Sequence, residues 1–186
     1  MIKAAFCDDD LSVLNELHVL MDNYRVERNQ EITYTAFHSP LELIAQIEKG
    51  MRFDILFLDV LMPGVNGIET AQEIREYDSA MKIIFLTSSA EYAVESYTVN
   101  AYFYQLKPIW PESFYRLMDS VLKECAQEQR RSLILRCKSG ITQISLDRLM
   151  YCEVQGRTLV FHMQNGEQLE SVGSMDAVSY THLRAH

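Results

Sequence analysis

Short hydrophobic runs and longer amphipathic segments alternate over the first two thirds of the chain. The runs have the length of strands, and several are apolar throughout, as strands buried on both faces are; they cover residues 2–7, 31–37, 54–58, 82–86 and 101–106. Between them, apolar residues recur every three or four positions, which predicts helices over residues 11–29, 39–50, 68–74, 88–99 and 111–125. Five alternations of strand and helix predict an α/β fold with a doubly wound sheet of five parallel strands.

The period of the pattern changes to two beyond residue 131. Alternating strand-like runs cover residues 133–137, 141–145, 150–153, 158–163 and 168–172, and Asn165-Gly166 is a strong hairpin signal. We therefore predict a smaller, mostly β domain over residues 132–178, after a first domain over residues 1–125. The polar residues 126–131 separate the two patterns and are interpreted as a linker or the end of the last helix.

Composition places the protein among ordinary globular chains. Of its 186 residues, 48% are hydrophobic and 23% are charged. No apolar run approaches the ~20 residues that span a bilayer, and the N-terminus lacks a signal-peptide core, so we expect a cytoplasmic protein without membrane contact. The four cysteines are widely scattered and are interpreted as reduced residues, not as a disulfide framework or a metal site.

The net charge of -9 is unevenly distributed. Residues 1–129 hold ten basic and 21 acidic residues, whereas residues 130–186 hold seven basic and five acidic ones. This asymmetry is consistent with two domains that have different partners, although ordinary surface variation also produces such differences.

Polar side chains follow four of the five predicted parallel strands. Asp8 and Asp9 follow the first strand, Asp59 the third, Thr87 the fourth and Lys107 the fifth. Parallel strands end at one edge of a sheet, so these groups should converge on one crevice. Each has a simpler interpretation as a helix cap or a solvated turn residue, but four ordered strand ends favour a site.

Three carboxylates suit Mg²⁺, a hard cation that prefers oxygen ligands. Beside a metal, Asp59 could attack a phosphoryl group and form an aspartyl phosphate. Lys107 and the metal would neutralise the transferring phosphoryl oxygens, and Thr87 would donate a hydrogen bond to them.

The first domain resembles the receiver domain of two-component response regulators. The matching motifs occur in the family's order: Cys7-Asp8-Asp9-Asp10, Leu58-Asp59-Val60-Leu61-Met62-Pro63-Gly64, Leu86-Thr87-Ser88 and Tyr104-Gln105-Leu106-Lys107-Pro108. The resemblance implies a flavodoxin-like fold in which Asp59 accepts a phosphoryl group from a sensor histidine kinase. Asp8, Asp9, Asp59 and the backbone carbonyl of Leu61 would hold Mg²⁺, and Lys107, before a cis Pro108, would pair with the phosphoryl oxygens.

The resemblance also implies a switch. Thr87 would move toward the phosphate and Tyr104 would rotate inward after it, so that the face around residues 90–125 repacks. We expect a phosphoacceptor switch and not a true enzyme, and we hypothesise a phosphorylation-dependent homodimer through exposed aromatic residues on that face.

The second domain resembles the LytTR-type DNA-binding domain, over about half its length. Its matching pieces are residues 133–138, 147–153, Gly156-Arg157-Thr158 and the Asn165-Gly166 hairpin. The resemblance implies that Arg157 and Thr158 contact DNA, in an output domain that is truncated here. Residues 179–186 fit neither pattern and are interpreted as a non-native tail.

Two other functions are weighed against this one. A receiver-type protein acting only through protein contacts would use the β-rich segment as an interaction module. A phosphatase with an Asp nucleophile would place a second acid two residues after Asp59, where this chain has Leu61. The phosphatase is therefore the least favoured.

Overall fold

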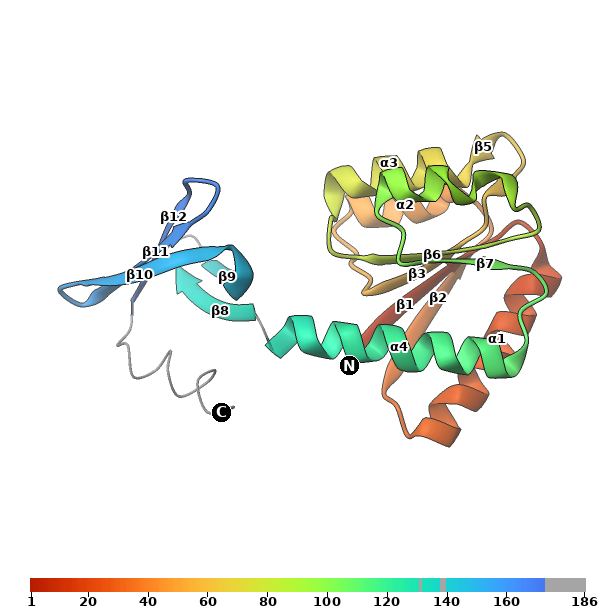
Figure 1. Cartoon of the computed structure of the whole chain (residues 1–186), viewed down its shortest axis with the longest axis horizontal. Helices are drawn as coiled ribbons and strands as arrows, with labels where there is room; N and C mark the ends of the chain where they lie inside the picture. The colour runs from red at the N-terminus through yellow and green to blue at the C-terminus, as the bar shows by residue number, and fades with distance from the viewer. Residues whose placement is uncertain (131, 138–139, 173–186) are drawn as a thin grey trace. The chain divides into compact units, whose positions relative to one another are not determined.

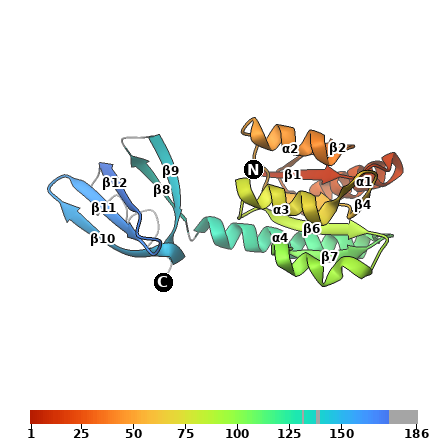
Figure 2. The ribbon, with the colours of Figure 1, turned by 90° about the horizontal axis from the view of Figure 1, so that it is seen from above.

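The computed structural model describes residues 1–130, 132–137 and 140–172. The chain divides into two compact units with a boundary between Val121 and Leu122. Each unit has its own five-stranded sheet (Figures 1 and 2). Within the described residues, no helix has the length and apolar character needed to cross a membrane.

The first unit is built on a parallel sheet with strand order β2-β1-β3-β6-β7. The strands are β1 (Ile2–Cys7), β2 (Ile32–Phe37), β3 (Ile55–Leu58), β6 (Lys82–Thr87) and β7 (Phe103–Leu106). The central strand β3 is buried at every position, which explains its unbroken apolar sequence. The predicted flavodoxin-like fold is confirmed.

Helices cover both faces of this sheet (Figure 1). Helices α2 (Pro40–Glu48) and α3 (Gly67–Tyr77) pack on one face, in a core that includes Leu43, Ile74 and Phe85. Helices α1 (Leu11–Arg28) and α4 (Pro111–Arg130) cover the other face. There the ring of Phe57 on β3 stacks on Phe114 of α4, with 5.6 Å between centroids.

The fourth predicted helix, over residues 88–99, is wrong in type. The structure has two short 3₁₀ helices instead, η1 (Glu91–Ala93) and η2 (Glu95–Val99). Two side-chain hydroxyls bond the carbonyl three residues earlier: Ser96 to Ala93 and Thr98 to Glu95, both at 2.7 Å. Such local bonds compete with the i to i-4 ladder of an α-helix, and 3₁₀ geometry follows.

A small hairpin in the loop after Asp59 was not predicted. Strands β4 (Leu61–Met62) and β5 (Val65–Asn66) pair antiparallel, with Gly64 at φ 81° in the turn. A two-residue ladder is too short to give a strand pattern in the sequence.

The second unit is an antiparallel sheet with strand order β10-β11-β12-β8-β9. Its strands are β8 (Ser132–Cys137), β9 (Gly140–Ser145), β10 (Leu149–Gln155), β11 (Thr158–Met163) and β12 (Gln168–Val172), with a 3₁₀ turn η3 (Leu146–Arg148) before β10. The predicted Asn165-Gly166 hairpin joins β11 and β12, with Gly166 at φ 83°. One sheet face buries a separate core that includes Leu135, Leu159 and Phe161. The predicted mostly β second region is confirmed.

The predicted linker over residues 126–131 continues helix α4 as far as Arg130. Its Ala, Gln, Glu and Arg residues are good helix formers, and no Gly or Pro interrupts them. The domain bounds themselves stay a prediction, and the predicted tail over residues 179–186 lies outside the described part of the chain.

Candidate functional site

The three consecutive aspartates at the end of β1 have three different environments. Asp10 is the N-cap of α1: its carboxylate accepts hydrogen bonds from the Ser12 amide at 2.8 Å and the Ser12 hydroxyl at 2.6 Å. Asp8 is 2% exposed and accepts the Asp10 amide at 3.0 Å, whereas Asp9 is exposed. One aspartate caps the helix, and two remain for other chemistry.

Lys107 joins Asp8 to Asp59 at the carboxyl edge of the sheet. Its Nζ donates to Asp8 Oδ2 at 2.7 Å and to Asp59 Oδ2 at 2.6 Å. Asp59 is 5% exposed, and its Oδ1 accepts the Leu61 amide at 3.1 Å. Backbone pairing explains the approach, because the Asp59 amide donates to the Cys7 carbonyl at 3.0 Å. The structure therefore brings together strand ends separated by almost 100 residues.

The electrostatics of this group reflect burial and pairing. Burial lowers the pKa of Lys107, but the hydrogen bonds that its ammonium donates to the two aspartates outweigh burial and the pKa is raised, so the ammonium form persists. Burial raises the pKa of Asp8, against the opposing effect of Lys107. A buried carboxylate cluster with one compensating cation keeps a net negative charge, and this favours the binding of a further cation.

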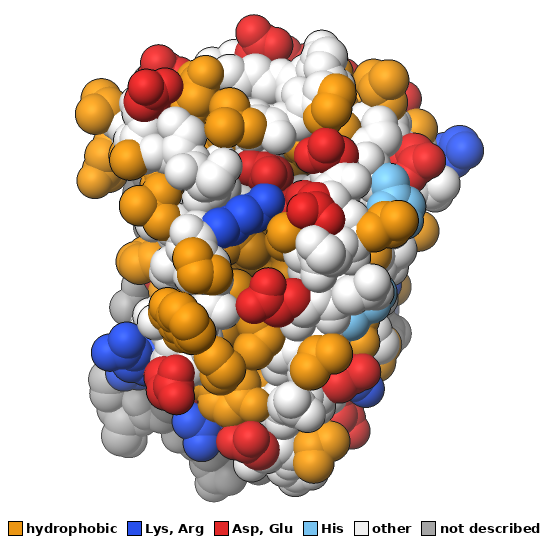
Figure 3. Space-filling model, turned by 90° about the vertical axis from the view of Figure 1, so that its right-hand side faces the viewer, with side chains coloured by type: hydrophobic (Ala, Val, Ile, Leu, Met, Phe, Trp, Pro, Cys, Tyr) orange, Lys and Arg blue, Asp and Glu red, His pale blue; other side chains and the backbone are white. Residues whose placement is uncertain are grey.

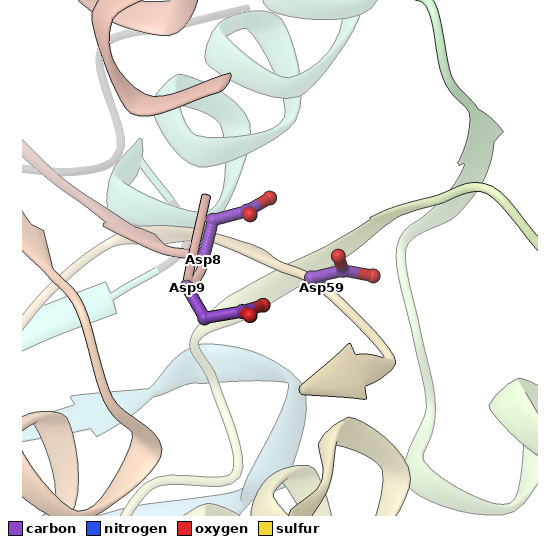
Figure 4. A group of neighbouring side chains, drawn as sticks. All are labelled: Asp8, Asp9 and Asp59. Carbon is purple, nitrogen blue, oxygen red and sulfur yellow. The ribbon is translucent and has the colours of Figure 1, made fainter. Parts of the chain in front are cut away.

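Asp8, Asp9 and Asp59 are arranged to share a cation. Each offers a carboxylate oxygen, and these oxygens lie within 4.8 Å of one another. Figure 4 shows the Asp8 and Asp9 side chains extending toward the side on which Asp59 lies. On the face of the molecule in Figure 3, acidic side chains lie around a basic one. An all-oxygen set of this kind suits Mg²⁺; Leu61, expected to add a carbonyl ligand, lies in β4 beside Asp59.

Thr87 and Tyr104 are linked through the residues after β6. Thr87 is fully buried, and its hydroxyl accepts the Ser89 amide at 3.5 Å. The Tyr104 hydroxyl donates to the Ser89 carbonyl at 2.6 Å, and its ring packs against the core beside Phe85. Tyr104 therefore lies inward here and touches the segment that begins at Thr87.

Gly67 shapes this site, although the sequence analysis gave it no role of its own. It opens α3, and its amide donates to the Val60 carbonyl at 2.9 Å. A Cβ at this position would clash with the Asp59 carbonyl and lie 2.8 Å from the Val60 Cα. Only glycine lets α3 approach the loop after Asp59 so closely. In the sequence, the only signal of this close approach is a glycine directly after the Asn66 N-cap.

The expected DNA-contacting residues lie in the second unit, at the turn between β10 and β11. Arg157 is exposed there beside Gly156, which has φ 65°, and Thr158 is the first residue of β11. Their contact with DNA stays a prediction.

A doubly wound five-stranded sheet with aspartates and a lysine at its carboxyl edge defines the receiver class of signalling domains. Residues 5–119 match the model of the response regulator receiver domain, and the chain belongs to that family. The receiver prediction is therefore confirmed, and receiver domains are phosphoacceptor switches rather than true enzymes.

The similar proteins are regulators. The sensory transduction protein LytT of Oceanobacillus iheyensis is 30% identical over 125 residues, which are 63% of this chain and 51% of LytT. The transcriptional regulatory protein NatR of Bacillus subtilis is 25% identical over 159 residues, or 85% of this chain and 66% of NatR. LytR of Staphylococcus aureus is 25% identical over 188 residues, which cover 100% of this chain and 71% of LytR. The chain thus spans about half to two thirds of the first two relatives.

Solved structures support the fold of the first unit. The response regulatory domain of mrkE from Klebsiella pneumoniae has a TM-score of 0.60 at 23% identity, covering 68% of this chain and 99% of that one. The chemotaxis protein CheY4 of Vibrio cholerae has a TM-score of 0.56 at 25% identity, covering 65% of this chain and 98% of that one.

Proposed function

We propose that this protein is a phosphorylation switch in which Asp59 accepts a phosphoryl group from a sensor histidine kinase. The observation that supports this most strongly is the triad of Asp8, Asp59 and Lys107, held at 2.6 and 2.7 Å by three different strand ends. Because the Asp59 carboxylate is almost buried and has a cation beside it, it fits the role of a nucleophile better than that of a surface turn residue.

In the proposed transfer, an Asp59 oxygen bonds to phosphorus while the P–N bond to the donor imidazole breaks. The electron pair of that bond leaves with the imidazole nitrogen. The charge on the phosphoryl oxygens faces the Lys107 ammonium, which the two aspartates keep protonated. The Leu61 amide, which already bonds Asp59 Oδ1, fixes the orientation of the carboxylate.

We propose Mg²⁺ as the cofactor, held by Asp8, Asp9 and Asp59 with the Leu61 carbonyl. When bound, it would neutralise the phosphoryl oxygens as they approach three carboxylates. The donor set fits this ion because all of its side-chain ligands are carboxylate oxygens. In the metal-free protein Lys107 supplies the only described side-chain cation bonded to Asp8 and Asp59.

The proposed readout uses Thr87 and Tyr104. New phosphoryl oxygens on Asp59 would draw the Thr87 hydroxyl, which now accepts from the Ser89 amide. The Tyr104 hydroxyl bonds the Ser89 carbonyl. A movement of Thr87 would therefore shift the segment that follows Ser89. The hypothesised homodimer would use exposed apolar residues on this side of the unit: Tyr97, Phe103, Leu106 and Trp110.

The phosphoacceptor is tested by intact-mass analysis after incubation with acetyl phosphate and Mg²⁺. The wild type should gain one phosphate adduct, and Asp59→Asn should gain none, because the amide is not a nucleophile toward phosphorus. Asp54→Asn is the matched control: Asp54 caps the Lys3 amide at the opposite end of the same strand. An adduct of equal yield in Asp59→Asn would contradict the assignment.

We further propose a DNA-binding output in the longer protein, of which this chain holds a part. The transcriptional regulators NatR and LytR extend their similarity into the second unit. Arg157 and Thr158, at the β10–β11 turn, are the proposed contacts. The competing proposal is a module that binds only proteins.

A further inference from the structure

A half-buried arginine on α3 joins three separate backbone segments. The Arg75 guanidinium donates to the carbonyls of Val99 at 2.8 Å and Asn100 at 3.1 Å, at the end of η2. It also donates to Asp78 at 3.1 Å, after α3, and to Met81 at 2.8 Å, before β6. All four acceptors are main-chain carbonyls.

This geometry suits arginine and no other side chain. The guanidinium is a rigid, planar fork with five donors, so it bonds several carbonyls at once, whereas a lysine ammonium is a single point of charge. Carbonyls at the end of a helix carry partial negative charge and lack intrahelical donors, so a cation there is stabilising. Arg75 therefore fixes the end of η2 to the helix that η2 packs beside.

The C-terminal end of η2 is closed in a second way. Asn100 has φ 48°, and the Ala101 amide bonds the Ser96 carbonyl at 3.1 Å, a Schellman-type closure. Val99 is 2% exposed and belongs to the core. The end of the segment is thus held by Arg75, by its own backbone and by burial.

The N-terminal part of the segment is held more weakly. Helix η1 has no buried residue, and Val94 is 77% exposed. Tyr97, at the start of the next turn, is 79% exposed. The shortest described bond here is from the Tyr104 hydroxyl to the Ser89 carbonyl at 2.6 Å. Regions with few buried contacts open at low free energy, so the two ends of this segment differ in local stability.

We propose that Arg75 is a positioning residue of the switch, the fixed pivot of the segment 89–100. A change at Thr87 and Tyr104 would reorganise residues 89–97, while Arg75 holds Val99 and Asn100 on α3 and keeps the change from reaching the start of β6. This inference rests on the proposed function, because the input is phosphorylation of Asp59. Without Arg75, the C-terminal end of the segment would loosen as well, and the response would no longer be confined to residues 89–97.

Hydrogen exchange followed by mass spectrometry tests this on the whole chain. Arg75→Gln removes the charge and most of the donors, and Arg75→Lys is a second variant that keeps the charge, with an intermediate effect expected. The matched control is Arg52→Gln, since Arg52 also bonds main-chain carbonyls near a helix end, those of Ile47 in the last turn of α2 and Met51 after it, both at 3.0 Å.

In metal-free protein, Arg75→Gln should speed exchange at residues 99–102 by about tenfold, which corresponds to about 1.4 kcal/mol. Arg52→Gln should leave that exchange unchanged. With Mg²⁺ and beryllium fluoride, which imitates a phosphoryl group, wild-type exchange should change at residues 89–97 and stay constant at 99–102. In the Arg75 variants it should change at both.

Two results would overturn the inference and are separable from a failure of the proposed function. A wild type with a phosphate adduct, together with equal exchange at residues 99–102 in the Arg75→Gln and Arg52→Gln variants, would refute the pivot alone. A wild type without an adduct would refute the phosphorylation switch, and the role of Arg75 in it.

Discussion

At the scale of single residues, similar side chains have unlike roles because their surroundings differ. Asp8 and Asp10 are two positions apart, yet burial raises the pKa of Asp8 while hydrogen bonds from Ser12 lower that of Asp10. The resemblance predicted Asp8 and Asp9 as the metal ligands, but sequence spacing alone did not separate the helix cap from the buried carboxylate. That separation depends on which carboxylate Lys107 reaches, almost 100 residues away.

Asp8→Asn should raise the melting temperature of the metal-free protein. The pKa of Asp8 is raised in the folded state, so the folded state binds its proton more tightly than the unfolded state does. That stabilisation is complete below the unfolded pKa and is lost as pH rises through the folded pKa. At neutral pH the ionised carboxylate therefore opposes folding, and a neutral isostere removes this cost while Asp59 still pairs with Lys107.

Thermal unfolding at pH 7 and at acid pH, with and without Mg²⁺, measures this effect. The variant should lose the acid-dependent part of its stability and most of the stabilisation by Mg²⁺. Asp10→Asn is the control, since Asn also caps helices and little change is expected. A lower melting temperature for Asp8→Asn would mean that the pair with Lys107 outweighs burial.

At the scale of elements, the hydrophobic period predicted type and position where packing agrees with local preference. The strands of both five-stranded sheets and helices α1, α2, α3 and α4 follow the pattern. The exception is the segment over residues 88–99, where Ser96 and Thr98 bond their own backbone and the helix becomes 3₁₀. This is the segment to which Thr87 and Tyr104 connect, so an element with weak local preference lies where the switch is proposed.

Helices α1 and α4 are joined by a polar contact that should contribute to the stability of the receiver unit. The buried Tyr24 hydroxyl donates to Asp119 at 2.7 Å. Tyr24→Phe should lower the free energy of unfolding by about 1 kcal/mol. Urea titration followed by the fluorescence of Trp110, the single tryptophan, measures it.

Tyr77→Phe is the matched control for Tyr24→Phe. The Tyr77 hydroxyl bonds Glu48 at 3.1 Å on the surface, and its loss should change the free energy of unfolding by less than about 0.5 kcal/mol. An equal decrease in the free energy of unfolding in both variants would show that the contact between α1 and α4 stabilises the protein no more than the surface contact does.

At the scale of the whole molecule, two units with opposite charge have separate cores. Residues 1–129 are acidic, and residues 130–186 are mildly basic. Similarity to LytR covers both units. Among the described residues, the converging carboxylate cluster lies in the receiver part. The receiver family rests on the match over residues 5–119, while the output stays a proposal.

Arg157→Ala tests the output by binding to random duplex DNA at several salt concentrations. If Arg157 contacts a phosphate, affinity should fall at low salt and the slope of log K against log salt should shrink by about 1. Lys49→Ala, an equal loss of charge on the exposed surface of the receiver unit, should leave both unchanged. Identical binding by the two variants would favour the module that contacts only proteins.

The sequence by itself determined the alternation of strands and helices, the change of period after residue 131, and the polar residues at the strand ends, because burial and local preference act over a few neighbouring positions. Only the tertiary structure decided which groups meet. Lys107 bonds Asp59, Gly67 makes room for the Asp59 loop, and Arg75 holds the end of η2. These contacts join residues far apart in the chain, and they depend on strand order and side-chain reach, which no local pattern contains.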